Sequence, residues 1–425
     1  LKVLCITHQR PPLSSDEKQQ LREWIDSGAA WSLEYIDPAV YAHAGSEMQD
    51  FVRRLTIEEY IQTVQAAVGV DISAEAREML PPDLRADGFS NTAYNLNVEL
   101  RHVESFGKLA EIIVGRMDIA KFADRFDTNR SFSDESMRTL IGQIGKWLLR
   151  GPLDDSEITA LRGVTTTVSA TSGSVDQAIG FVVQAMLQSP RFLYRIESQH
   201  HTGGYVDSHE LASRLSYLLW GGPPDQALMQ VADEGGLDLD GCQQQVARML
   251  KHPRAVEHSK RFVMDWLDLD RLANMRPDVE RFPNWSPELA ADMRAETIAF
   301  FEQIVWKEGR PLSELLNAQV AFATPRLARH YGLTPLYTSK AVGDNNERDA
   351  QGAGEQLAAY DVSEVPSRGG LLLQGSVLTV GGDDASTVTR GLFVLHELLR
   401  GVVNDPPPCV DTTQRPTKSG LTRRA

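Results

Sequence analysis

The chain has 425 residues, of which 42% are hydrophobic and 24% charged. This composition is ordinary for a folded protein with a buried core, and it excludes collagen-like and globally disordered chains. The 43 basic and 58 acidic residues give a net charge of -15. Such a charge argues against nucleic acid as the main partner, because phosphate binding needs concentrated Lys and Arg. No uncharged apolar run reaches the roughly 18 residues of a membrane helix, so we expect no membrane span.

Helix signals recur along most of the chain. Capping-box patterns, in which an N-cap side chain is followed three residues later by Glu, precede several apolar stripes: Ser14-x-x-Glu17, Thr56-x-x-Glu59, Asp154-x-x-Glu157 and Asp207-x-x-Glu210. Gly28 and Gly69 mark helix ends, and Ser286-Pro287 marks another helix start. Strand signals are weak, since residues 371–373 and 377–380 fit a buried helix or a short strand equally. We expect a mainly α fold, with several small helical domains in series and long irregular loops.

The chain has three cysteines, Cys5, Cys242 and Cys409. They are too few for a disulfide scaffold, and none belongs to a C-x-x-C or C-x-x-C-H pattern, so we predict neither a thiolate zinc site nor a covalent haem site in this chain. Cys5 and Cys409 are candidates for a disulfide if the compartment is oxidising. Cys242 is interpreted as a buried, inert thiol. The absence of an initiator Met and the Pro-rich segment near the C-terminus indicate a fragment of a longer protein.

Each candidate functional residue has two possible interpretations, one structural and one functional. His330 is expected near a helix end, where it is either a helix stop or a redox or proton-relay residue. Asp383 and Asp384 follow two glycines and form either a solvated turn or a site for a hard cation such as Ca²⁺. No G-x-S-x-G, H-E-x-x-H or P-loop pattern occurs, so no catalytic residue is identified, no metal site is predicted, and enzymatic activity stays open.

Several phrases, in their order along the chain, resemble the planctomycete-type cytochrome c family. These are large bacterial envelope proteins built from serial domains of unknown function. The phrases begin with Arg53-Arg54-Leu55-Thr56, Ser189-Pro190-Arg191-Phe192, Leu211-Ala212-Ser213-Arg214, Arg368-Gly369-Gly370 and Pro406-Pro407-Pro408. The resemblance implies a cytochrome c remnant over residues 1–48 and small helical domains over 49–115 and 116–200. A main helical domain over 201–335 and a loop-rich domain over 336–425 would follow.

One departure from the family concerns haem. Arg10 precedes Pro11-Pro12, where family members often place the Met that ligates haem iron. The resemblance implies haem c in the parent protein. Because this chain has no C-x-x-C-H pattern, that haem would be attached to residues outside it.

Six arginines accompany the family phrases: Arg191, Arg195, Arg214, Arg254, Arg368 and Arg390. We expect them to form buried pairs with acids such as Glu197, Asp225 or Glu296; a clamp for a substrate carboxylate is the alternative. Trp220, Trp266 and Trp285 are expected to anchor cores.

The resemblance implies the helical body of an extracytoplasmic protein, in the periplasm or cell envelope. This body would serve redox chemistry or electron delivery and would meet a protein or redox partner. A non-catalytic envelope scaffold or complex subunit is the alternative, and a polysaccharide-active enzyme is a weaker one.

Overall fold

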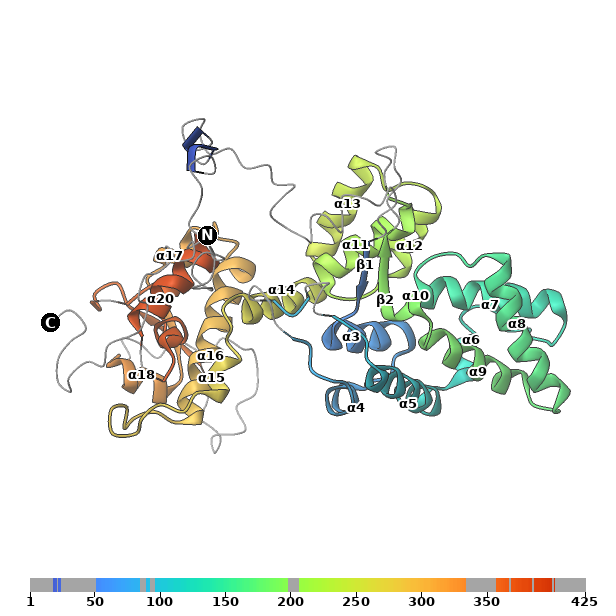
Figure 1. Ribbon diagram of the computed structural model, residues 1–425, viewed down its shortest axis with the longest axis horizontal. Helices are drawn as coiled ribbons and strands as arrows, with labels where there is room; N and C mark the ends of the chain where they lie inside the picture. The colour runs from blue at the N-terminus through green and yellow to red at the C-terminus, as the bar shows by residue number, and fades with distance from the viewer. Residues whose placement is uncertain are drawn as a thin grey trace. The chain divides into compact units, whose positions relative to one another are not determined.

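The computed structural model describes residues 18–20, 22–23, 51–84, 89–91, 96–197, 206–333, 357–366, 368–383, 386–399 and 401 (Figure 1). Two units are distinguished, Met48–Phe393 and a unit made of Leu1–Glu47 with Val394–Ala425. In the latter, residues 18–20 and 22–23 are helical, inside the helix predicted after Ser14, and η6 (Val394–Leu398) is a π-helix. The prediction of a mainly α fold is confirmed.

The larger unit begins with a short strand and four helices: β1 (Phe51–Arg54), α3 (Ile57–Val68), α4 (Ser73–Met79), α5 (Leu100–Arg116) and α6 (Ile119–Ala123). The predicted capping box at the start of α3 is confirmed: Thr56 accepts from the backbone N–H of Glu59, and the Glu59 carboxylate accepts from that of Thr56. Gly69 ends the helix in the left-handed region, at φ 76°.

Removing this cap should weaken the fold measurably. The Thr56→Ala substitution deletes the oxygen that accepts from Glu59, and we expect a loss of about 1 kcal/mol in the free energy of unfolding, measured with urea. Thr56→Ser should restore most of it. Thr167→Ala, at an exposed site inside a helix, is the control; an equal loss there would contradict the prediction.

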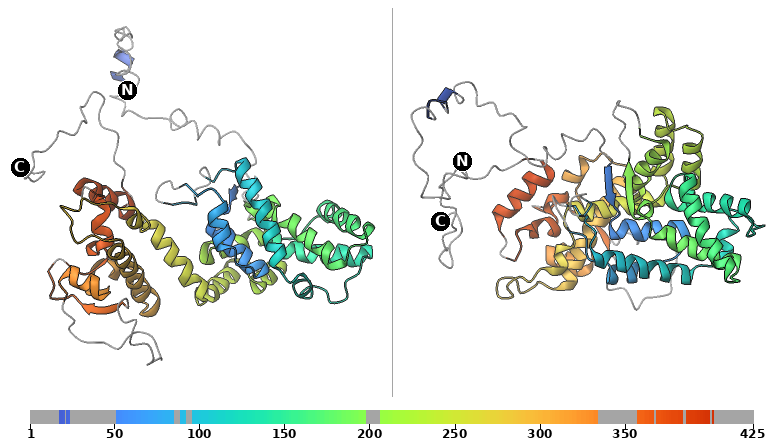
Figure 2. Two further views of the ribbon diagram at one scale, coloured as in Figure 1. Left: turned by 90° about the horizontal axis from the view of Figure 1, so that it is seen from below. Right: turned by 45° about the vertical axis from the view of Figure 1, so that its right-hand side comes forward.

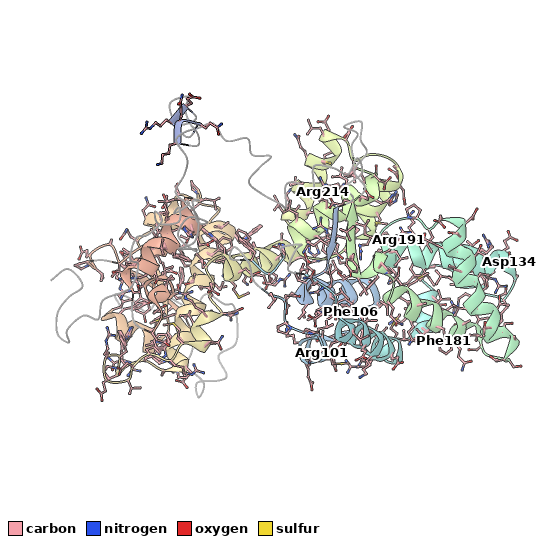
Figure 3. The ribbon with its side chains drawn as sticks, in the orientation of Figure 1. Arg101, Phe106, Asp134, Phe181, Arg191 and Arg214 are labelled. Carbon is pink, nitrogen blue, oxygen red and sulfur yellow. The ribbon has the colours of Figure 1, made fainter. Side chains whose placement is uncertain are left out.

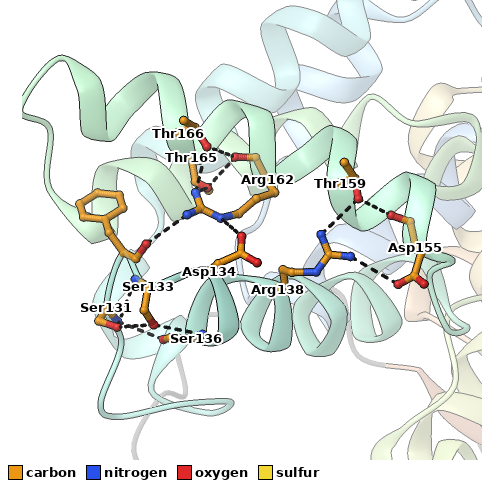
Figure 4. A network of polar contacts seen from close by, with 11 residues as sticks. Ser131, Ser133, Asp134, Ser136, Arg138, Asp155, Thr159, Arg162, Thr165 and Thr166 are labelled. Atoms are coloured by element: carbon orange, nitrogen blue, oxygen red, sulfur yellow. Dashed lines mark hydrogen bonds and ion pairs between the residues drawn. The ribbon is translucent and has the colours of Figure 1, made fainter.

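A second group of helices follows: α7 (Asp134–Leu149), α8 (Asp155–Ala170), α9 (Val175–Leu187) and α10 (Pro190–Leu193). The predicted capping box of Asp154 and Glu157 opens α8. Polar contacts tie α8 to the start of α7, where Arg162 donates to the Asp134 carboxylate and to the Phe132 carbonyl (Figure 4). Leu109, Leu140, Val183 and other side chains of α3, α4, α5, α7 and α9 form the first core.

The strand β2 (Tyr194–Glu197) closes this part of the chain by pairing antiparallel with β1 (Figure 2). In this register Arg53 lies opposite Arg195. Neither strand was predicted from the sequence. Each has four residues, and the partner lies far along the chain, so local periodicity carries no signal for the pairing.

Four helices come next: α11 (Ser208–Trp220), α12 (Gln226–Asp233), α13 (Leu239–Leu250) and α14 (Pro253–Trp266). Asp207 caps α11 as predicted, but the predicted capping box with Glu210 is wrong, because the Asp207 carboxylate accepts from the backbone N–H of His209. Trp220, Leu228 and Met249 form a second core with the first turns of α14. The last turns of α14 belong to a further core with Phe300 and Ile304.

The remaining elements of this unit are short apart from one helix. They are α15 (Arg271–Asn274), α16 (Pro287–Phe301), the π-helix η3 (Glu302–Lys307), α17 (Glu314–Asn317), β3 (Val320–Ala323), α18 (Pro325–Tyr331), β4 (Ala358–Asp361), the 3₁₀ helix η4 (Leu371–Leu373), α19 (Gly375–Leu378), the 3₁₀ helix η5 (Thr379–Gly381) and α20 (Thr387–Phe393). Strands β3 and β4 pair antiparallel. Residues 371–373 and 377–380, whose sequence fits a buried helix and a short strand equally, are helical in the structure. In the described ranges, no helix has both the length and the apolar character needed to cross a membrane.

Candidate ligand-binding cavities

Glu197, the last residue of β2, is a buried carboxylate shared by two arginines. One oxygen accepts from Arg195 at 2.8 Å, and the other accepts from Arg214 of α11, whose Nε lies at 3.0 Å. Figure 3 labels Arg214 and Arg191, which come from α11 and α10. Since β2 pairs with β1 and Glu197 binds Arg214 of α11, this carboxylate joins the β1–β2 sheet to α11. The predicted pairing of Arg195 and Arg214 with Glu197 is thus confirmed.

Two arginines lie opposite one another across this small sheet. Arg53 is 5% exposed and pairs with Glu59 at 2.7 Å, but its Nη1 is buried without a hydrogen-bond partner. Arg195 similarly keeps a buried Nε without a partner. Burial, and then repulsion from Arg53, lower the pKa of Arg195. Like charges placed directly opposite in a strand pair are unfavourable, so this arrangement costs stability as it stands.

Arg150 adds a third buried guanidinium to the same region. It occupies the left-handed region at φ 62°, where it ends α7. Its Nη atoms donate to the backbone carbonyls of Arg191, Phe192 and Tyr194, at 2.5 to 3.2 Å. No carboxylate accepts from Arg150 within the residues described. The guanidinium groups of Arg150 and Arg195 both lie over the buried ring of Tyr217, 5.6 and 5.4 Å from its centroid.

We call Arg53, Arg150, Arg195, Arg214, Glu59 and Glu197 the arginine cluster. It contributes Arg150, Arg195 and Glu197 to the wall of a cavity of about 370 Å³. The start of α11 supplies a second wall, with Asp207, His209, Glu210 and Ser213. The Asp207 side chain is largely exposed, at 60%, whereas Glu197 is buried and Glu59 half-buried, and both are already bound to arginine.

A larger groove of about 660 Å³ lies next to this cavity. Its lining comes from α7, α12 and the turn after α6, and consists of Arg125, Phe126, Gln143, Lys146, Trp147, Gln226, Met229, Gln230 and Asp233. Asp233 of the groove pairs with Lys146 at 2.5 Å and bonds the ring of His209, which lines the cavity, at 2.9 Å. Burial opposes ionisation of Asp233, but these two contacts outweigh it and lower its pKa.

Glu296 of α16 forms a separate buried polar site. It is 1% exposed and accepts a 2.6 Å hydrogen bond from the Tyr331 hydroxyl, which accepts from the N–H of Gly375 at 2.8 Å. The Arg368 guanidinium lies 3.6 Å from the centroid of the Tyr331 ring. Burial raises the pKa of Glu296 to about 7, although Tyr331 and Arg368 act in the opposite direction.

The residues singled out from the sequence lie apart from these sites. His330 is in the last turn of α18 and lines a small hollow of about 270 Å³ with Arg326 and Arg329; burial and Arg368 lower the pKa of its ring. Asp383 is exposed and accepts from the backbone N–H of Arg276 at 2.8 Å. Asp384, Cys5 and Cys409 lie outside the described residues. The functional roles proposed for all five stay predictions.

Other arginines have partners that differ from those expected. Arg191 binds Glu157, Asp225 binds Arg248, and Arg254 lies over the ring of Trp220 at 4.5 Å. Trp220 is a core anchor as predicted, being 1% exposed, while Trp266 and Trp285 are half-buried. Cys242 is half-buried, and burial raises the pKa of its thiol, which fits the predicted inert role.

Arg53, Glu59 and Arg150 were not predicted from the sequence as parts of a site. Arg53 was noted only as part of a phrase, and Glu59 only as half of a capping box. Arg150 follows an apolar helix, and a non-glycine residue at a helix end carries no signal for burial. Their convergence depends on the pairing of β1 with β2.

Neutralising the shared carboxylate should be costly. In Glu197→Gln, Arg195 and Arg214 lose their anionic partner, and we expect the free energy of unfolding to fall by about 3 kcal/mol. Glu58→Gln is the matched control, because Glu58 pairs with Arg77 on the surface and exposed pairs contribute about 0–1 kcal/mol. If urea denaturation gave equal losses of unfolding free energy for Glu197→Gln and Glu58→Gln, Glu197 would not stabilise the contact between β2 and α11.

The fold and site define a mainly helical protein whose consecutive segments share an arginine-lined cavity. Residues 53–118 match the family model PSD3, a protein of unknown function (DUF1587), residues 136–197 match PSD5 (DUF1595), and residues 206–333 match PSD4 (DUF1592). The expected series of domains of unknown function is thereby confirmed over residues 53–333, while the predicted domain boundaries stay predictions. No curated protein and no solved structure matches the chain.

Proposed function

We propose that this chain is the ligand-binding helical body of an extracytoplasmic protein that works with haem c domains outside this chain. The body would hold a ligand in the arginine-lined cavity and would meet a redox or protein partner. Support comes from the serial segments of unknown function and from the family phrases that run through them.

The location of the cavity carries this proposal. Its wall includes Arg150 and Arg195 from the segment matching PSD5 and Ser213 from the segment matching PSD4. Arg53, from the segment matching PSD3, lies opposite Arg195 in the sheet. A cavity with a few convergent polar groups, placed where segments meet, is the usual setting of a binding site.

Binding is better supported than acid–base catalysis at this cavity. Both carboxylate oxygens of Glu197 already accept from arginine, so this buried acid is not free to exchange a proton with a ligand. Paired carboxylates on either side of a sugar, which a glycosidase needs, are therefore not supported at its inner wall. The same observation favours the second candidate, a non-catalytic envelope scaffold.

Covalent haem would have to be attached outside these residues. The chain contains no C-x-x-C-H pattern, and the described residues contain no group of three or more His, Cys, Asp or Glu side chains that could hold a metal ion. This chain's part in redox chemistry would accordingly be to bind and position a ligand or a partner.

The test is a visible spectrum and a haem-stained gel of protein purified from its native source, with intact mass measured on the same sample. A Soret band on a species heavier than the 47.1 kDa of this chain is the expected result. A native species without haem would overturn the redox part of the proposal and would favour the scaffold.

A further inference from the structure

We further propose that the groove between α7 and α12 is a second binding site, which takes an acidic sugar, a hexuronate, through its carboxylate and hydroxyl groups. This site goes beyond the function proposed above, and it shares no lining residue with the arginine-lined cavity. Three features support it: an arginine held by aromatic rings, side-chain amides without partners, and apolar side chains beside these polar groups.

Arg125, in the turn after α6, is the anchor of this site. Its guanidinium lies 4.8 Å from the centroid of the Trp147 ring and 5.5 Å from that of the Phe126 ring, and both rings line the groove. The Trp147 indole N–H donates to the Ala67 carbonyl at 2.8 Å, and Arg125 donates to the same carbonyl at 3.4 Å. Aromatic faces orient an arginine without neutralising its charge, so this guanidinium is positioned in advance for an anion.

Among the described residues, no carboxylate forms an ion pair with Arg125. The other charged side chains of the lining, Lys146 and Asp233, pair with each other at 2.5 Å. Asp124, the neighbour of Arg125 in sequence, binds Arg130 instead. Because Arg125 is an exposed residue, a carboxylate in the groove can reach its guanidinium, whose planar shape matches two carboxylate oxygens.

Side-chain amides on both walls supply hydrogen bonds of the kind that a sugar ring makes. Gln143 of α7 and Gln226 of α12 are exposed and have no hydrogen-bond partner within the part of the chain that the structure describes. Gln230, one turn after Gln226, donates to Glu234 at 3.0 Å. An amide offers both donors and an acceptor, as does a sugar hydroxyl group, so the two walls can bind hydroxyl groups on either edge of a ring.

The apolar part of the lining and the volume of the groove fit the same ligand. Phe126 and Trp147 are half-buried and Met229 is buried, so apolar surface lies beside the amides and can contact the C–H groups of a sugar ring. The volume of about 660 Å³ lies within the range of small-molecule sites. A simple carboxylic acid would use Arg125 alone, whereas a hexuronate uses the arginine, the amides and the apolar side chains together.

Isothermal titration calorimetry of the full chain with sodium glucuronate, glucose and sodium butyrate, at equal ionic strength, tests this assignment. Glucose has the ring hydroxyl groups of glucuronate but no carboxylate, and butyrate has the carboxylate but no sugar ring. We expect saturable binding of glucuronate with one site per chain, and an affinity at least tenfold lower for each of the other two compounds.

Each contrary outcome removes a defined part of the proposal. Equal affinities for glucuronate and glucose would overturn the role of Arg125 as an anion anchor. Equal affinities for glucuronate and butyrate would overturn the assignment to sugars, and the absence of saturable glucuronate binding would overturn the site itself. None of these outcomes bears on the haem test, so this proposal and the proposed function can fail separately.

A matched pair of variants locates the site. Gln226→Glu places a competing carboxylate in the groove, at the first position of α12, where a negative charge is compatible with the helix dipole. We expect it to lower the affinity for glucuronate at least tenfold. Gln244→Glu makes the same change at an exposed position of α13 outside this lining, and should bind within about twofold of the parent chain.

A substitution of the anchor completes the test. Arg125→Gln should also lower the affinity for glucuronate at least tenfold, because it removes the charge-assisted hydrogen bonds to the carboxylate. Its affinity for glucose should stay within about threefold of that of the parent chain. Equal glucuronate affinities in the Gln226→Glu and Gln244→Glu chains would show that the sugar binds outside this groove.

Discussion

Replacing Trp220 with alanine should lower the free energy of unfolding by about 3–5 kcal/mol. The side chain is 1% exposed, and its indole N–H donates to the Met249 carbonyl at 3.0 Å. The guanidinium groups of Arg254 and Arg248 lie 4.5 and 5.7 Å from the ring centroid. Alanine would leave a large cavity, an unpaired buried carbonyl and two arginines without their aromatic contact.

The control for this substitution is Phe181→Ala. Phe181 lies on α9 and is 53% exposed (Figure 3), so its removal should change stability by less than about 1 kcal/mol. Urea denaturation followed by circular dichroism measures both variants. A loss for Trp220→Ala no larger than that for Phe181→Ala would show that the second core does not depend on the indole.

Raising the pH from 5 to 8 should destabilise the protein through Glu296. Burial raises the pKa of this carboxyl from about 4.5 to about 7 in the folded chain. Its contribution to stability is fully present below about pH 4.5, where the group is protonated in both states. As the pH rises, the unfolded chain loses the proton first, so the contribution falls until the folded group has also ionised, above about pH 7. The total loss is roughly 3 kcal/mol, because one pKa unit corresponds to about 1.4 kcal/mol.

The Glu296→Gln chain isolates this effect. Glutamine does not titrate, so the difference in unfolding free energy between this variant and the parent should change with pH by roughly 3 kcal/mol. The measurement is urea denaturation at pH 4, 5, 6, 7 and 8. Glu111→Gln, on the exposed side of α5, should show no such pH-dependent difference. A constant difference for Glu296→Gln across this range would mean that the folded carboxyl titrates at its ordinary pKa.

The two substitutions probe different cores of the larger unit. Trp220 belongs to the core beside α11 and α13, whereas Glu296 lies on α16, beside Tyr331 and α19. Neither residue lines the arginine-lined cavity.

The sequence alone determined the features that depend on residues within one or two helical turns. Thr56 and Glu59, like Asp154 and Glu157, are three residues apart, so each capping box is visible in the sequence and is present in the structure. Gly69 ends its helix for an equally local reason, since glycine tolerates a positive φ. The mainly α class follows from many such signals, and the serial organisation was recognised from short phrases.

Only the tertiary structure decided the candidate site. Arg53 and Arg195 are far apart in sequence and become neighbours because β1 pairs with β2 in one register, and strands this short carry no local sign of their partner. Arg150 reaches the same place by ending α7 in the left-handed region. Likewise Glu296 is an ordinary acid in the sequence, and its raised pKa arises from side chains that bury it from other elements. Burial and strand pairing are long-range properties, so the convergence of these arginines at one cavity exists only in the folded chain.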